Sequence, residues 1–117
     1  MIKVGVIGAG HLGKIHLNIL STSDFDLVGF HDTDVSNSEK LASEKGYVFF
    51  KDLNTLINSI DAAVIVSPTT THFEIAQKCI KNGLHIFVEK PLTTNSKEAR
   101  IIKKLAEEKN IIGQVGF

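Results

Sequence analysis

The chain has 117 residues, of which 43% are hydrophobic and 22% are charged, so it is long and apolar enough to form one globular domain. Thirteen Lys and Arg residues balance thirteen Asp and Glu residues, and this neutrality argues against a basic surface for nucleic acids or anionic membranes. The one cysteine, Cys79, excludes an intramolecular disulfide and is expected to be a small core residue.

The sequence shows no internal repeat, low-complexity tract or linker, which favours a single domain over residues 1–117. Its first residues lack the apolar stretch of a signal peptide. No segment approaches the roughly 20 apolar residues of a membrane span. We therefore expect a cytoplasmic protein.

Strand-like and helix-like segments alternate along the chain, which is typical of a parallel sheet with helices on its faces. The pattern predicts strands at residues 2–7, 27–31, 47–50, 62–66, 84–88 and 111–116. It predicts helices at 11–21, 38–45, 52–58, 70–82 and from Asn95 or Ser96 to about 109. The expected fold is α/β: a three-layer, doubly wound Rossmann fold with six parallel strands in the order 3-2-1-4-5-6.

The spacing of apolar residues also predicts which side of each helix is buried. In the helix at 11–21, Leu12, Ile15, His16 and Ile19 are spaced to form one inward face. In the helix at 70–82, the inward residues are expected to be Ile75, Ala76, Cys79 and Ile80.

A glycine-rich turn, Gly8-Ala9-Gly10-His11-Leu12-Gly13, fits the pattern G-x-G-x-x-G between a predicted strand and a predicted helix. Gly8 permits the tight turn, Gly10 lets the backbone approach a pyrophosphate, and Gly13 lets the helix pack on the strand. His11 is expected to contribute mainly its backbone. The start of a helix also offers unpaired N–H groups and a partial positive charge to an anion. The alternative is a turn that binds no ligand. An acidic residue about 20 positions later, as in dinucleotide-binding domains, argues against this alternative.

That acidic residue is Asp32, at the end of the second predicted strand. It is expected to accept hydrogen bonds from the adenosine ribose hydroxyls and to repel a 2′-phosphate, which favours NAD over NADP. His31 is the only basic candidate nearby for a 2′-phosphate. The alternative is that Asp32 merely begins the turn at 32–34.

Two polar segments follow the fourth and fifth predicted strands: Ser67-Pro68-Thr69-Thr70-Thr71-His72 and Glu89-Lys90-Pro91. Ligands of open α/β sheets bind outside the carboxyl ends of the strands. The Ser and Thr side chains there can hold ribose and amide groups. Lys90 is a charged residue at a strand end, with a rigid proline after it.

Together, the glycine-rich turn and these two segments resemble the N-terminal half of the Gfo/Idh/MocA oxidoreductases, most specifically over residues 82–92. The family oxidises or reduces sugars, inositols and related polyols with NAD(P). The resemblance implies that Lys90 lies beside the nicotinamide and exchanges a proton with the oxygen that gains or loses hydride. It also implies that Glu89 and Pro91 shape the nicotinamide ribose pocket. The cofactor cleft would further be lined by Ser67, Pro68, Thr69 and His72.

The resemblance covers this chain but only about the first third of a usual family member. The family's substrate-binding α+β domain, with the catalytic Asp and His of many members, would begin near residues 114–117. We therefore expect the nucleotide-binding half of an NAD-dependent oxidoreductase that acts on a secondary alcohol of a sugar, inositol or nucleotide-sugar. The 117-residue chain should bind cofactor without turnover. Expected partners are the dinucleotide and, in the complete enzyme, the sugar-like substrate, with a homo-oligomer left open.

Several alternatives remain at this stage. A methyltransferase turn usually reads G-x-G-x-G after an acidic residue, whereas Ile7 precedes this turn and Leu12 replaces the third glycine. A non-enzymatic NAD(H) sensor or scaffold would not need Lys90. His72 could equally bond only to backbone, Glu89 could pair with a nearby cation, and His16 is expected to pack in the core. No Cys/His spacing indicates a metal site.

Overall fold

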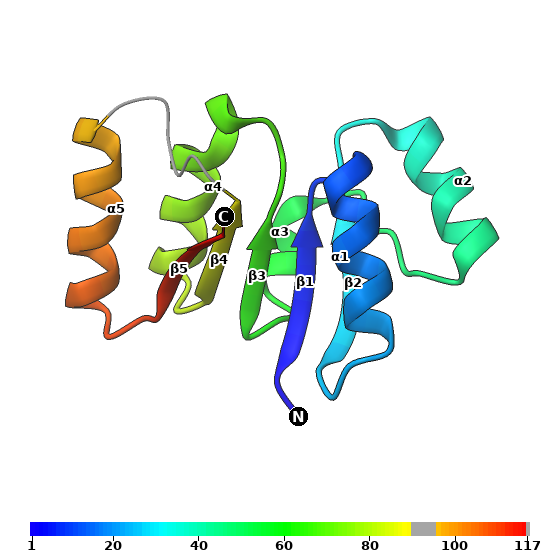
Figure 1. Ribbon diagram of the computed structural model, residues 1–117, viewed down its shortest axis with the longest axis horizontal. Helices are drawn as coiled ribbons and strands as arrows, with labels where there is room; N and C mark the ends of the chain where they lie inside the picture. The colour runs from blue at the N-terminus through cyan, green and yellow to red at the C-terminus, as the bar shows by residue number, and fades with distance from the viewer. Residues whose placement is uncertain (90–95, 117) are drawn as a thin grey trace.

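The computed structural model describes residues 1–89 and 96–116, with the backbone alone for 114–116. Strands and helices alternate along these ranges, except that α2 is followed directly by α3 (Figure 1). In chain order the elements are β1 (Lys3–Ile7), α1 (His11–Ser21), β2 (Asp26–His31), α2 (Val35–Lys45), α3 (Leu53–Ile57), β3 (Ala62–Ile65), α4 (Thr69–Lys81), β4 (His85–Glu89), α5 (Ser96–Glu108) and β5 (Gly113–Gly116). None of the helices in the described ranges is long and apolar enough to cross a membrane.

All five described strands run parallel in one sheet, in the order β2-β1-β3-β4-β5. This is the predicted doubly wound order with one strand fewer, because the expected strand at 47–50 is wrong. That segment lies along the edge of β2 and pairs with it through a single parallel bridge between Phe30 and Phe49. The next ladder acceptor, the carbonyl of Phe50, instead accepts a 2.8 Å hydrogen bond from Nδ1 of His31. A side chain therefore bonds the acceptor at which the ladder would continue.

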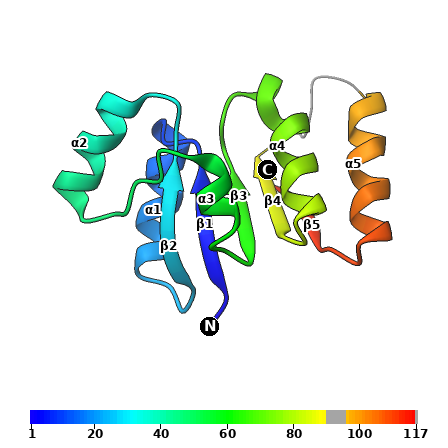
Figure 2. The same ribbon diagram turned by 180° about the vertical axis from the view of Figure 1, so that it is seen from behind.

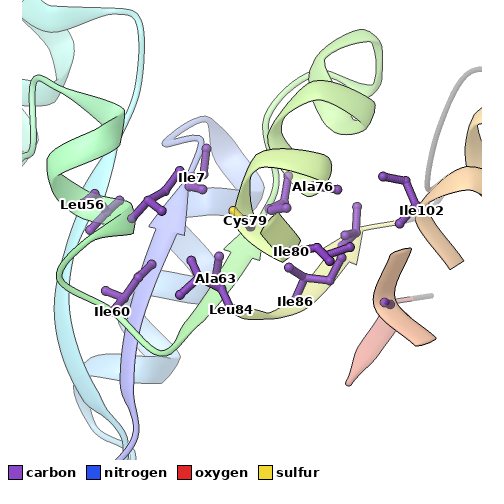
Figure 3. Packing of buried hydrophobic residues seen from close by; sticks show 14 residues of the cluster. Ile7, Leu56, Ile60, Ala63, Ala76, Cys79, Ile80, Leu84, Ile86 and Ile102 are labelled. Carbon is purple, nitrogen blue, oxygen red and sulfur yellow. The ribbon is translucent and has the colours of Figure 1, made fainter. Parts of the chain in front are cut away.

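The sheet is covered on both faces, as the doubly wound fold requires. On one face, α1 and α2 contribute Leu17 and Leu41 to a hydrophobic cluster with Val6 and Phe30. The other face carries α3 and α4, seen in front of the sheet in Figure 2. A second hydrophobic cluster lies on this face and also includes residues of α5. Figure 3 labels ten of its members: Ile7, Leu56, Ile60, Ala63, Ala76, Cys79, Ile80, Leu84, Ile86 and Ile102.

The central strand β3 and helix α4 agree with their predicted burial. Val64 of β3 packs in one cluster and Ile65 in the other, so the apolar run is explained by burial on both faces. In α4, Ala76, Cys79 and Ile80 are fully buried. Burial raises the pKa of the Cys79 thiol to about 12, so the thiol stays protonated at neutral pH.

Helix α1 buries a different side from the one predicted. Its buried residues are Gly13 and Leu17. Three residues expected to face inward are instead exposed: Leu12 (48%), Ile15 (42%) and Ile19 (57%). The reason is the close approach of Gly13 to the carbonyl of Gly8, where an added Cβ would overlap the oxygen. This contact turns the side of α1 that carries Gly13 and Leu17 toward the sheet.

Candidate cofactor-binding site

The glycine-rich turn connects the end of β1 to the start of α1. Gly8 has a φ of +107°, which side chains rarely adopt, and a Cβ at this position would lie 2.5 Å from the backbone nitrogen of Ser67. The backbone N–H of Gly8 donates a 2.8 Å hydrogen bond to the carbonyl of His31. The turn is therefore packed between the ends of β2 and β3, where only glycine fits.

Gly10 is different, because it faces open space. It is the N-cap of α1, with φ −72° and ψ −160°, and nothing lies within 4 Å of the position that a Cβ would take. Gly10 has no side chain that could satisfy the first N–H groups of α1, and these groups are available to an anion. His11 and Leu12 are exposed beside this opening, and Ala9 is half-buried.

The carboxylate of Asp32 ties this turn to the end of β2. Its Oδ2 accepts a 2.6 Å hydrogen bond from the backbone N–H of Ala9, and its Oδ1 accepts a 2.8 Å bond from the N–H of Asp34. Both oxygens keep further acceptor capacity. Asp32 therefore does begin the turn at 32–34, and it also remains able to accept hydrogen bonds from a ligand.

A polar cleft of about 490 Å³ opens between this turn, the end of β2 and the two helices on that face. Asp32 and Gly10 line it together with two lysines that sequence reasoning missed, Lys14 of α1 and Lys40 of α2. Lys14 could have been noticed because it directly follows the glycine motif. The position of Lys40 in the sequence gives no sign that it lines this cleft. It does so only because the fold places α2 beside α1.

The segment after β3 lies against the turn, as the contact between Gly8 and Ser67 shows. The Ser67 hydroxyl lies 2.8 Å from the Thr71 hydroxyl, and Pro68 is the N-cap of α4, with Thr69 the first helical residue. His72 is only 2% exposed, and its Nε2 donates a 2.7 Å hydrogen bond to the Ser67 carbonyl. His72 is therefore a buried residue that holds the backbone of the turn at Ser67.

At the end of β4, Glu89 makes a hydrogen bond with a residue of α1 that was expected to pack in the core. His16 Nε2 lies 2.8 Å from Glu89 Oε1, and each side chain is 21% exposed. The ring of Phe87 packs beside the His16 ring, with centroids 5.8 Å apart and planes inclined by 59°. His16 is therefore partly exposed and hydrogen-bonded, and the expectation that it packs in the core is wrong. The partners are 73 positions apart, so no local pattern could have revealed them.

The structure thus brings three predicted segments to the carboxyl edge of the sheet: the glycine turn with Asp32, the turn at Ser67, and the end of β4 at Glu89. Lys90 and Pro91, the remaining residues predicted for the site, lie outside the described residues. What the edge can do chemically follows from its parts. Backbone N–H groups at α1 suit a phosphate, and the Asp32 carboxylate suits vicinal hydroxyls.

We expect Gly8→Ala to lower the free energy of unfolding by about 2–4 kcal/mol, because the methyl group must overlap the Ser67 backbone as well as accept a positive φ. Urea denaturation measures the loss. Gly83→Ala is a matched control, since Gly83 has a φ of +79° but open space around its Cβ position. Gly83→Ala should lower the free energy of unfolding by only about 1–2 kcal/mol, which is the cost of a positive φ for alanine. Equal losses in the two variants would contradict the packing role of Gly8.

Comparison with known proteins agrees with this geometry. A family model described as "Oxidoreductase family, NAD-binding Rossmann fold" (GFO_IDH_MocA) matches residues 2–117. The chain belongs to the Gfo/Idh/MocA oxidoreductase family. The resemblance inferred from the glycine turn and the Glu89-Lys90-Pro91 segment is confirmed, and the methyltransferase alternative is excluded.

Among the curated relatives, UDP-N-acetylglucosamine 3-dehydrogenase of Acidithiobacillus ferrooxidans is 32% identical over 114 residues, covering 97% of this chain. The scyllo-inositol 2-dehydrogenase (NAD(+)) of Bacillus subtilis is 36% identical over 121 residues, covering 99% of the chain. The chain spans only 36% and 35% of the lengths of these two relatives.

Solved structures show the same fold. The A. ferrooxidans enzyme GnnA superposes with a TM-score of 0.93 at 32% identity, over 98% of this chain and 38% of that one. GenD2 from gentamicin A biosynthesis, in complex with NAD, gives 0.91 at 28% identity, over 98% of this chain and 34% of that one. Both structures share the fold of this chain.

Proposed function

We propose that this chain is the NAD(H)-binding domain of a dehydrogenase that oxidises a secondary alcohol of a sugar, inositol or nucleotide-sugar substrate. The observation that carries the proposal is the turn from β1 to α1, with Gly8 and Gly13 packed so tightly that only glycine fits and Gly10 open to the outside. A turn that served only to connect a strand to a helix would not need the open position. A dinucleotide needs it, because its pyrophosphate must come close to the backbone there.

The residues present fit such a cofactor. Asp32 lines the cleft with acceptor capacity for the adenosine ribose, and the first N–H groups of α1 would hold the pyrophosphate. Ser67, Pro68 and Thr69 would line the middle of the site, with His72 supporting them through the Ser67 carbonyl. Glu89 and Pro91 would border the nicotinamide ribose. The bound nicotinamide would supply the hydride acceptor, and the protein would orient it.

By its resemblance to the family, Lys90 is the residue to which we assign the proton transfer at the substrate oxygen. The named relatives act on UDP-N-acetylglucosamine, glucose-6-phosphate and inositols, which supports a polyhydroxylated substrate. These relatives are long enough to contain a further, substrate-binding domain. Such a domain would hold the substrate against the nicotinamide.

We propose NAD as the preferred cofactor. The Asp32 carboxylate lies at the proposed ribose position and would repel a 2′-phosphate, whereas Lys14 and Lys40 in the same cleft would attract one. Asp32 is bonded directly to the turn, through the Ala9 N–H. Its charge should therefore dominate the choice.

We expect NADH to bind the 117-residue chain about ten- to a hundredfold more tightly than NADPH, the size of a charge-assisted hydrogen bond. Asp32→Asn should narrow this gap, mainly by improving NADPH binding, because it removes the charge and keeps an acceptor for the Ala9 N–H. Calorimetric titration with both cofactors measures the ratio.

Asp52→Asn is the control for the change in net charge, because Asp52 caps α3 and is outside the cleft. It should leave the ratio unchanged. Equal affinities for NADH and NADPH in the unaltered chain would refute the role of Asp32, and failure to bind either cofactor would refute the proposed function.

A further inference from the structure

The contact between His16 and Glu89 joins two parts of the sheet edge that are not neighbours. α1 follows β1, whereas Glu89 ends β4, and β3 lies between these two strands. The contact therefore links the helix that follows β1 to a strand two positions away from β1 in the sheet. It connects the helix whose first turn carries the proposed phosphate site to the strand end that immediately precedes Lys90.

The core does not explain this contact. The buried residues of α1 are Gly13 and Leu17, and His16 is not among them. A single hydrogen bond between two side chains adds little net stability, because folding exchanges it for hydrogen bonds with water. Its geometry is nevertheless well defined, since Phe87 packs against the His16 ring while Nε2 meets the carboxylate at 2.8 Å.

We infer that His16 is a positioning residue: by holding the Glu89 carboxylate, it fixes the nicotinamide side of the site relative to the phosphate side. The inference rests on the proposed function, because it assumes a dinucleotide that spans both. A glutamate side chain has several freely rotating bonds, and ordering them during binding costs affinity. A carboxylate already held by His16 would meet the ligand in place.

This role makes an unusual prediction about which ligands are affected. ADP carries the adenosine and pyrophosphate but no nicotinamide ribose, so it would use the glycine turn and Asp32 and would not reach Glu89. NADH would use both sides. Loss of this contact should therefore weaken NADH binding and leave ADP binding unchanged, whereas damage to α1 itself should weaken both.

The test is calorimetric titration of the 117-residue chain and its variants with NADH and with ADP. We expect His16→Leu to weaken NADH by about three- to tenfold and ADP by less than about twofold. His16→Gln should restore most of the NADH affinity, because its amide nitrogen can replace Nε2 as a donor. Glu89→Gln should weaken NADH like His16→Leu, and combining His16→Leu with Glu89→Gln should add little.

His85→Leu is the matched control. His85 lies at the opposite end of β4, where its Nδ1 accepts a 3.0 Å hydrogen bond from the Ile112 N–H. This variant loses a histidine contact of similar length and should bind NADH normally.

Equal weakening of NADH and ADP by His16→Leu would overturn the positioning role, as would unchanged NADH affinity or no recovery in His16→Gln. Failure of the proposed function would look different. In that case the unaltered chain itself would bind NADH no better than ADP, or would not bind NADH at all.

Discussion

Replacing Gly10 by valine should abolish NADH binding and leave the fold intact. The backbone at Gly10 has φ −72° and ψ −160°, an extended conformation that valine adopts readily, and nothing lies within 4 Å of its Cβ position. The branched side chain would therefore occupy the open space that the pyrophosphate must enter. We expect affinity to fall by at least about a hundredfold, equivalent to ~2.7 kcal/mol.

Two measurements test this expectation together. Calorimetric titration with NADH gives the affinity, and urea denaturation shows that stability is retained to within about 1 kcal/mol. Thr22→Val is the control, because Thr22 is exposed at the other end of α1. It introduces the same side chain far from the turn and should bind NADH normally. Retained binding in a folded Gly10→Val protein would mean that the cofactor does not use this turn.

Replacing Lys90 by alanine should slow the reaction far more than it weakens cofactor binding. The expectation comes from the family resemblance, which assigns Lys90 the proton transfer at the substrate oxygen. Loss of a positioned acid or base typically slows a reaction by about 10²- to 10⁴-fold. In a protein that joins this chain to a substrate-binding domain, we expect such a fall in kcat and a change in NADH affinity of less than about threefold.

The measurement is sugar- or inositol-dependent reduction of NAD, followed by absorbance, alongside direct titration with NADH. Lys104→Ala is the control, since Lys104 is exposed on α5. The 117-residue chain alone should bind NADH without turnover, because orientation of the substrate accounts for about 7–11 kcal/mol of barrier lowering and requires a substrate site. Near-normal turnover after Lys90→Ala would refute the acid/base assignment of Lys90.

Prediction from sequence failed where a tertiary contact overrode a local pattern. The apolar spacing in α1 predicted an inward face at Leu12, Ile15 and Ile19. The close approach of Gly13 to Gly8 instead turns Leu17 inward and leaves that face exposed. The segment at 47–50 has the composition of a strand. It pairs with β2 through one bridge only, and the next acceptor, the Phe50 carbonyl, is bonded by the His31 ring instead.

The sequence by itself determined the fold class, the strand order and the family, since these depend on patterns that local physics imposes. Alternating apolar runs dictate a parallel sheet, and glycines at fixed spacing dictate a turn that a pyrophosphate can approach. Only the tertiary structure decided which side chains meet at the sheet edge. His16 reaches Glu89 across 73 positions, and Lys40 joins Asp32 in one cleft. Such contacts depend on how each helix is rotated against the sheet, which cannot be read from the residues that surround each partner along the chain.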